Sequence, residues 1–213
     1  MINHTLASLL ALPGAADCEI LVVDGEPSES TLRSIEHDTV RKVRSAKGRA
    51  IQMNEGSRRA AGDILLFLHA DTTLPENALE CIFTALEAED VVGGAFTLSI
   101  DSPRKVFRII EAATNWRNRL LRVPYGDQAI FLDRTFFKRL GGYSDLPLME
   151  DVELMQRVRR TGAQIQVLKD RVKTSPRRWD AEGIVIGTLR NWLIRSLFAV
   201  GVSPQQLVKF YPS

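Results

Sequence analysis

The stretch LLFLHADTTLP, Leu65 to Pro75, decides the fold prediction because it joins an apolar run to a polar turn. Its first four residues are apolar, as expected for a strand buried in a sheet. The run then gives way to His69 and Asp71, which are spaced two apart, so in an extended chain both side chains point to the same side. Either they form a ligand site at the strand tip, or Asp71 caps the following helix or closes a local turn.

Strand-like and helix-like segments alternate on both sides of this stretch. Such alternation favours a mostly parallel sheet covered by helices on both faces, so we predict an α/β fold. Ligands of such sheets bind beyond the carboxyl ends of the strands, where Asp24 and Asp71 are expected. The predicted strands are 19–24, 39–44, 64–70, 91–98, 129–132 and 164–168, and the predicted helices are 28–38, 51–61, 76–88, 104–121 and 151–161.

The composition indicates one globular domain. The chain has 213 residues, of which 45% are hydrophobic, so we expect a domain over residues 1–180 with a C-terminal helical appendage, 181–213, packed on it. Lys and Arg number 28 against 26 Asp and Glu, a balance that argues against nucleic acid as a partner. Cys18 and Cys81 lack the spacing of a disulfide framework or a zinc site.

The two ends of the chain bear on location. The N-terminus lacks the basic start and cleavage site of a signal peptide, which predicts a cytoplasmic protein. Arg190 and Arg195 interrupt the apolar stretch 183–202, so this stretch is not expected to span a membrane. Its apolar residues follow helical spacing and either dock on the core, which we prefer, or make peripheral contact with the inner membrane face. These residues are Ile186, Leu189, Leu193, Leu197 and Val200.

Four segments, taken in order, resemble the family-2 glycosyltransferases of GT-A fold. EILVVDGEPSEST (19–31) is similar to the second strand of the family and its acidic turn. GRAIQMNEGSRRAAGDILLFLHADT (48–72) is similar to the nucleotide-contacting helix and the strand that carries the DxD motif. YGDQAIFLDRTFFKRLGGY (125–143) and LPLMEDVELMQRVRRTG (146–162) are similar to the acceptor-side segment and the Glu-Asp motif. The LHADT, GDQ and MEDVEL motifs resemble a branch often associated with arsenosugar gene neighbourhoods.

The resemblance implies transfer of a sugar from a nucleotide-diphosphate donor to an acceptor hydroxyl with inversion, dependent on Mn²⁺ or Mg²⁺. It assigns Asp151 as the general base and Glu150 as the residue that orients it. His69 and Asp71 would hold the metal, and imidazole at position 69, where the family has an acidic residue, favours Mn²⁺. The residues expected to contact the donor are Asp24, Arg49, Asn54, Asp71, Arg178 and Trp179.

Each of these residues also has a purely structural interpretation. Glu150 and Asp151 open an amphipathic helix, where carboxylates favour the positive end of the dipole. Arg178 and Trp179, in SPRRWD (175–180), could form a basic turn with a tryptophan packed in the core. Arg49 and Asn54 are residue types that also occur on ordinary surfaces and at helix caps. The same two interpretations, functional and structural, apply to Asp127 in the GDQ motif.

Two further functions stay open at this point. A sugar nucleotidyltransferase uses a similar sheet but needs a glycine-rich, lysine-containing phosphate loop, which the sequence does not show. A catalytically inactive nucleotide-sugar-binding protein is the other alternative, because the chain opens on MINHTLASLLALPG, which resembles the helix after the first strand of the family rather than the strand itself. No motif specifies the donor sugar, its base or the acceptor.

Overall fold

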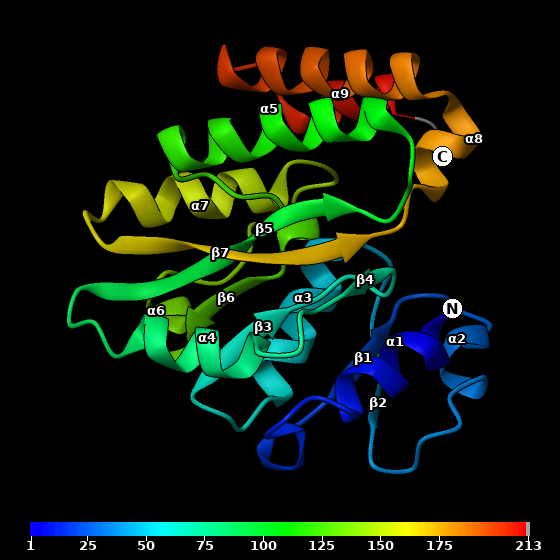
Figure 1. The fold of residues 1–213 in the computed structure, drawn as a ribbon, viewed down its shortest axis with the longest axis vertical. Coiled ribbons are helices and arrows are strands. Elements are labelled where there is room, and N and C mark those ends of the chain that lie inside the picture. The colour runs from blue at the N-terminus through cyan, green and yellow to red at the C-terminus, as the bar shows by residue number, and fades with distance from the viewer. Residues whose placement is uncertain (212–213) are drawn as a thin grey trace.

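The computed structural model describes residues 1–211, which form two sheets and the helices that cover them (Figure 1). β1 and β2 pair in parallel as a two-stranded sheet, and a five-stranded sheet has the order β3-β6-β5-β7-β4. The strands are β1 Leu21–Asp24, β2 Arg41–Arg44, β3 Ile64–Phe67, β4 Thr72–Thr73, β5 Val91–Ile100, β6 Ile130–Asp133 and β7 Gln164–Thr174. The helices are α1 Ile2–Leu10, α2 Ser30–Arg33, α3 Arg49–Arg59, α4 Ala78–Leu86, α5 Lys105–Leu121, α6 Arg134–Arg139, α7 Glu150–Arg160, α8 Arg177–Glu182, α9 Ile184–Ala199 and α10 Pro204–Leu207, with 3-10 turns η1 Ala15–Asp17, η2 Gly126–Gln128 and η3 Val208–Phe210.

The alternation of strands and helices is as predicted, but the larger sheet is mixed rather than mostly parallel. Only β5 and β7 pair in parallel in it, whereas β3 with β6, β5 with β6 and β4 with β7 are antiparallel. The order of elements along the chain does not give strand direction, and β6 inserts between β3 and β5 in the opposite sense. Gly93 and Gly94 allow this close pairing, because a Cβ on either would lie within 2.3 Å of a backbone oxygen of a neighbouring strand.

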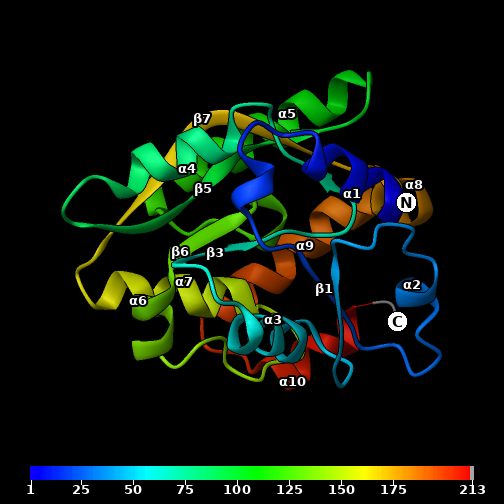
Figure 2. The same ribbon diagram turned by 90° about the horizontal axis from the view of Figure 1, so that it is seen from below.

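The sheet has a buried core on each face because neighbouring strand residues point to opposite sides. Phe96 and Phe131 pack with Ala78 and Ile82 of α4 on one face. On the other face, the alternate positions of the same strands pack against α3, α6 and α7 (Figure 2). The buried residues of this second cluster include Ala50, Ala95, Ile130, Leu132, Phe137, Val152 and Met155.

The N-terminal part forms a smaller cluster of its own. Leu6 of α1 is buried with Leu32, Ile35 and Val40 against the two-stranded sheet. Within the described residues, β1 pairs with β2 alone, and β3 pairs with β6 alone. The segment 1–10 is helical, as its resemblance to the first helix of the family predicted.

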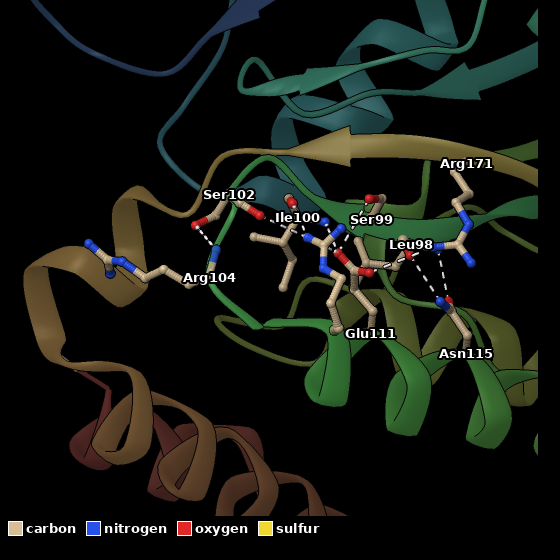
Figure 3. Close-up of polar contacts among 9 residues, drawn as sticks. Leu98, Ser99, Ile100, Ser102, Arg104, Glu111, Asn115 and Arg171 are labelled. Carbon is tan, nitrogen blue, oxygen red and sulfur yellow. Dashed lines mark hydrogen bonds and ion pairs between the residues drawn. The ribbon is translucent and has the colours of Figure 1, made fainter. Parts of the chain in front are cut away.

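Helix α5 is fixed to strand β5 by two polar side chains on its inner face (Figure 3). The Asn115 side chain accepts a hydrogen bond from the Leu98 N–H at 2.8 Å and donates one to the Leu98 carbonyl at 2.9 Å. The buried carboxylate of Glu111 accepts from the Ile100 N–H at 2.6 Å and forms ion pairs with Arg108 and Arg171. These bonds satisfy backbone groups of β5 and set the rotation of α5 about its own axis.

The C-terminal helix packs on the rest of the protein through a different face from the one predicted. Ile194 is fully buried with Leu148 and Leu207, and Leu197 packs against this cluster. Four of the five apolar positions expected to dock are instead exposed, since side-chain spacing defines an apolar face but not the direction in which the tertiary fold turns it. These exposed residues are Ile186, Leu189, Leu193 and Val200. No helix within residues 1–211 combines the length and apolar character needed to cross a bilayer.

Candidate active site

Seven of the nine predicted site residues line one cavity of about 180 Å³. The cavity is bounded by the β3–β4 turn, η2, the start of α7, α5, α8 and α9. It therefore collects residues from most of the length of the chain. The seven are Arg49, His69, Asp71, Glu150, Asp151, Arg178 and Trp179.

His69 and Asp71 lie in a turn and not on the strand itself, because β3 ends at Phe67, earlier than predicted. The Thr72 N–H donates to the His69 carbonyl at 3.1 Å, and the Ser175 N–H donates to the Asp71 carbonyl at 3.1 Å. These backbone bonds hold the turn beside β7. Helix α4 starts only at Ala78 and has no side-chain cap, so Asp71 does not serve as its cap.

The chemistry of His69 and Asp71 fits a divalent cation. Burial and the positive charge of Arg49 lower the pKa of His69 to about 4, so its imidazole is neutral at pH 7 and keeps a lone pair for a metal. Asp71 adds a carboxylate that forms an ion pair with Arg177 at 4.0 Å. Residues 1–211 contain no cluster of three or more His, Cys, Asp or Glu side chains arranged for a metal. Mg²⁺ and similar ions in phosphate-binding sites commonly use one or two protein ligands, with substrate oxygens and water completing the shell.

The Asp151 carboxylate is held in the first turn of α7 by two backbone donors. Its Oδ2 atom accepts a hydrogen bond from the Gly126 N–H at 2.6 Å, and its Oδ1 atom accepts one from the Val152 N–H at 2.7 Å. A side chain at position 126 would crowd His69, because a Cβ there would lie 2.8 Å from the Nε2 atom of His69. The turn at 126 therefore brings Asp151 and His69 together.

Glu150, next to Asp151, is buried and paired with a cation. Its Oε1 atom lies 3.6 Å from the Nη1 atom of Arg49, at the start of α3. Burial and the charge of Asp151 raise the pKa of Glu150, and Arg49 opposes this shift. Met149, which precedes it, has φ of +64°, an uncommon conformation for a non-glycine residue that is often found at functional sites.

Asp127 is a third carboxylate in the cavity, to which sequence reasoning gave little weight. It belongs to the GDQ turn, which the buried Gln128 ties to the Phe96 carbonyl at 3.0 Å. The Oδ1 atom of Asp127 is enclosed and has no hydrogen-bond partner. Burial and the negative charge of Asp151 raise the pKa of Asp127 from its ordinary value of 3.8 to about 6. A carboxylate in this state is either a base or a group that awaits a ligand.

Replacement of Asp127 with Asn is expected to stabilise the unliganded protein at neutral pH. Folding raises the pKa of this carboxyl. Its contribution to stability is therefore present when the pH is below the pKa in the unfolded chain, and it is lost as the pH rises through about 6. Because the residue is partly exposed, we expect a gain in unfolding free energy of about 1 to 2 kcal/mol near pH 7.5 and almost none near pH 4. Urea unfolding at both pH values measures it, with exposed Asp145→Asn as the control. An equal effect at the two pH values would contradict the account.

Aromatic and arginine side chains enclose the side of the cavity near α5 and α9. The guanidinium carbon of Arg117 lies 3.9 Å from the centre of the Tyr125 ring, and that of Arg195 lies 4.7 Å from it. Burial lowers the pKa of Arg117 to about 10 and raises that of Tyr125 to about 12. Sequence reasoning missed this stack because the three residues share no motif and meet only through the fold.

Arg178 and Trp179 of α8 form another wall. Arg178 donates a hydrogen bond to the hydroxyl of Tyr211, a lining residue that the sequence did not single out. The Trp179 ring packs edge-on against Phe107 with centroids 5.6 Å apart, and its indole N–H is buried without a partner. Trp179 therefore does both things that the sequence suggested: it packs against the core through Phe107, and it lines the cavity.

Asp24 and Asn54 do not line this cavity. Asp24 accepts the Glu26 N–H at 2.9 Å through Oδ1, which closes a turn, while its Oδ2 atom is buried without a partner. The Asn54 side chain bonds both the N–H and the carbonyl of Tyr143, at 2.9 and 2.8 Å. Asn54 thus fixes the loop before α7, and the nucleotide contacts of both residues stay predictions.

Comparison with known proteins gives the family and the fold of this chain. The family model described as glycosyl transferase family 2 matches residues 1–141, so the chain belongs to that family. No curated protein matches the sequence significantly. A crystal structure of GalNAc-T7 with UDP, GalNAc and Mn²⁺ shares the fold with a TM-score of 0.59 and 14% identity over 80% of this chain. The match spans 40% of that longer chain. The predicted α/β fold of GT-A type is confirmed.

Proposed function

We propose that the protein is an inverting glycosyltransferase that moves a sugar from a nucleoside-diphosphate donor to an acceptor hydroxyl. The observation that carries the proposal is the meeting of Asp71, His69 and Asp151 in one cavity that also holds Arg49 and Arg178. Such a site has a place for a cation, cationic groups for a diphosphate and a positioned carboxylate. The presence of UDP and Mn²⁺ in the GalNAc-T7 structure is consistent with this assignment.

In the proposed reaction, Asp151 acts on the acceptor. The acceptor oxygen attacks the anomeric carbon and loses its proton to the Asp151 carboxylate, while the bond from this carbon to the diphosphate oxygen breaks and leaves its electron pair on the diphosphate. A single displacement of this kind inverts the anomeric centre. The N–H groups of Gly126 and Val152 keep the carboxylate in position, and the neighbouring Glu150, which is itself paired with Arg49, is proposed to help orient it.

The other side of the cavity would hold the departing group. Asp71 and His69 are the proposed ligands of Mn²⁺ or Mg²⁺, with Mn²⁺ preferred because of the imidazole. A bound cation would neutralise charge that develops on the diphosphate. Arg178 and Arg49 supply guanidinium groups suited to phosphate oxygens. Trp179, with its unpaired indole N–H, lies where it can contact a bound ligand.

A thermal-shift screen with UDP, GDP and their sugars, with and without Mn²⁺, tests the proposal. A ligand that binds only the folded protein raises its melting temperature by mass action. We expect one nucleotide class to stabilise the protein strongly with Mn²⁺ and weakly without it. If no nucleotide changes the melting temperature under either condition, the donor assignment is wrong.

A further inference from the structure

Two helices that border the cavity carry apolar stripes facing away from the protein. On each helix the apolar side chains recur at helical spacing on the side opposite its buried residues. Exposed apolar patches of this extent mark interaction surfaces. We call the two stripes together the α5/α9 face: Val106, Ile109, Trp116 and Leu120 of α5, Val185, Ile186, Leu189, Trp192 and Leu193 of α9, and Val200 just after α9.

The outward orientation of these stripes is fixed by what lies beneath them. Glu111 and Asn115 bind the backbone of β5, so the opposite side of α5 has to face outward (Figure 3). Ile194 is fully buried on the inner side of α9, and the outer residues Leu189 and Trp192 are 61% and 59% exposed. In Figure 1 both helices lie at the end of the molecule away from β1 and β2. The inner contacts of α5 and α9 therefore fix the outward direction of the apolar stripes.

The charge on these helices indicates what the face binds. Of the six Lys or Arg residues in α5 and α9, the three exposed ones all lie on α5: Lys105, Arg119, and Arg108, which pairs with the buried Glu111. The two arginines of α9 are partly buried, Arg190 beside Glu182 and Arg195 over the Tyr125 ring. Lys105, Arg119 and Arg122 are exposed beside the α5 stripe. Apolar stripes with basic flanks are typical of helices that lie in the interface of an anionic bilayer. Trp116 and Trp192 are residues that favour that interface.

The cavity reaches the same face. Ile110 and Thr114 of α5 and Asn191 of α9 line it, and Trp192 contributes both to the lining and to the exposed stripe. We propose that the α5/α9 face docks on an anionic membrane surface, with the cavity beside the lipid headgroups. This docking does not depend on the transfer chemistry proposed above.

Vesicle sedimentation of the full chain tests the proposal, with phosphatidylcholine vesicles compared with vesicles that also contain phosphatidylglycerol. We expect binding to the anionic vesicles that weakens as salt is added, because salt screens the basic flanks. The double variant Trp116→Ser, Leu189→Ser should lose about tenfold in partitioning for each side chain removed. Neither residue lines the cavity, and both are mostly exposed, so the fold and the binding of nucleotide with Mn²⁺ should be unchanged.

Phe83→Ser is the matched control, since Phe83 is 54% exposed on α4, away from the proposed face. It should sediment like the wild type. Absence of binding to either kind of vesicle, or equal loss in the control, would overturn the proposal. A wild-type dimer in solution that the double variant dissociates would also overturn it, because the face would then be a protein interface.

Discussion

Asp151→Asn is expected to lower the rate of sugar transfer by about 10² to 10⁴-fold while donor affinity stays nearly unchanged. The amide cannot take the acceptor proton. Its oxygen can still accept the hydrogen bond that the Gly126 N–H donates at 2.6 Å, so the start of α7 should persist. The rate is measured as release of nucleoside diphosphate from the donor that the nucleotide screen identifies, alongside donor affinity and melting temperature.

Two variants separate catalysis from helix stability and from a rival base. Glu153→Gln removes another carboxylate from the first turn of α7, one that pairs with Arg157 and lies outside the cavity, so transfer should stay near normal. If the acidic start of the helix matters only through its dipole, Asp151→Asn and Glu153→Gln will behave alike. If Asp127 is the base, Asp127→Asn will abolish transfer and Asp151→Asn will not.

Asp71→Ala should remove the metal-dependent part of donor binding. Asp71 is the carboxylate of the proposed metal site, and His69 alone leaves a cation with a single protein ligand. At a donor concentration of about 100 times Kd, the wild type should gain about 2.7 kcal/mol from the donor with Mn²⁺. The variant should keep only the small gain seen without metal, as measured by thermal shift.

The control for Asp71 is Asp63→Ala, which removes a highly exposed carboxylate paired with Arg134 just before the same strand. It should bind donor and Mn²⁺ like the wild type. Asp71 is only weakly paired, 4.0 Å from Arg177, so little stability should be lost in its variant. Full retention of Mn²⁺-dependent donor binding by Asp71→Ala would remove this residue from the metal site.

Sequence reasoning predicted most of the local elements because they depend on nearby residues, but the helix predicted over 28–38 is only the single turn α2, Ser30–Arg33. The apolar run from Ile64 gives β3, and the acidic pair Glu150 and Asp151 opens α7 with Gly162 just beyond its end. The direction of β6 in the sheet could not be predicted, since it depends on pairing with β3 and β5 across long separations in the chain. For the same reason the sheet proved mixed.

The site residues also fall into two groups, those that the sequence could predict and those that depend on tertiary packing. Residues within motifs, such as Asp71 and Asp151, were found because their type and order match a known family. Arg117 and Tyr211 reach the cavity only through the packing of α5 and the C-terminal segment, and no local pattern signals this. The apolar stripe of α9 was predicted, but its spacing could not say that Ile194 would face the core and Leu189 the solvent.

Inverting sugar transfer is best tested by analysing the products that the protein releases from a nucleotide sugar with Mn²⁺. Phosphorus NMR identifies the phosphate product, and proton NMR during early turnover identifies the anomeric configuration of the sugar. We expect a nucleoside diphosphate and a sugar of inverted configuration, formed by the wild type and far more slowly by Asp151→Asn. Release of a sugar 1-phosphate and a nucleoside monophosphate, retained configuration, or tight binding without turnover would contradict it.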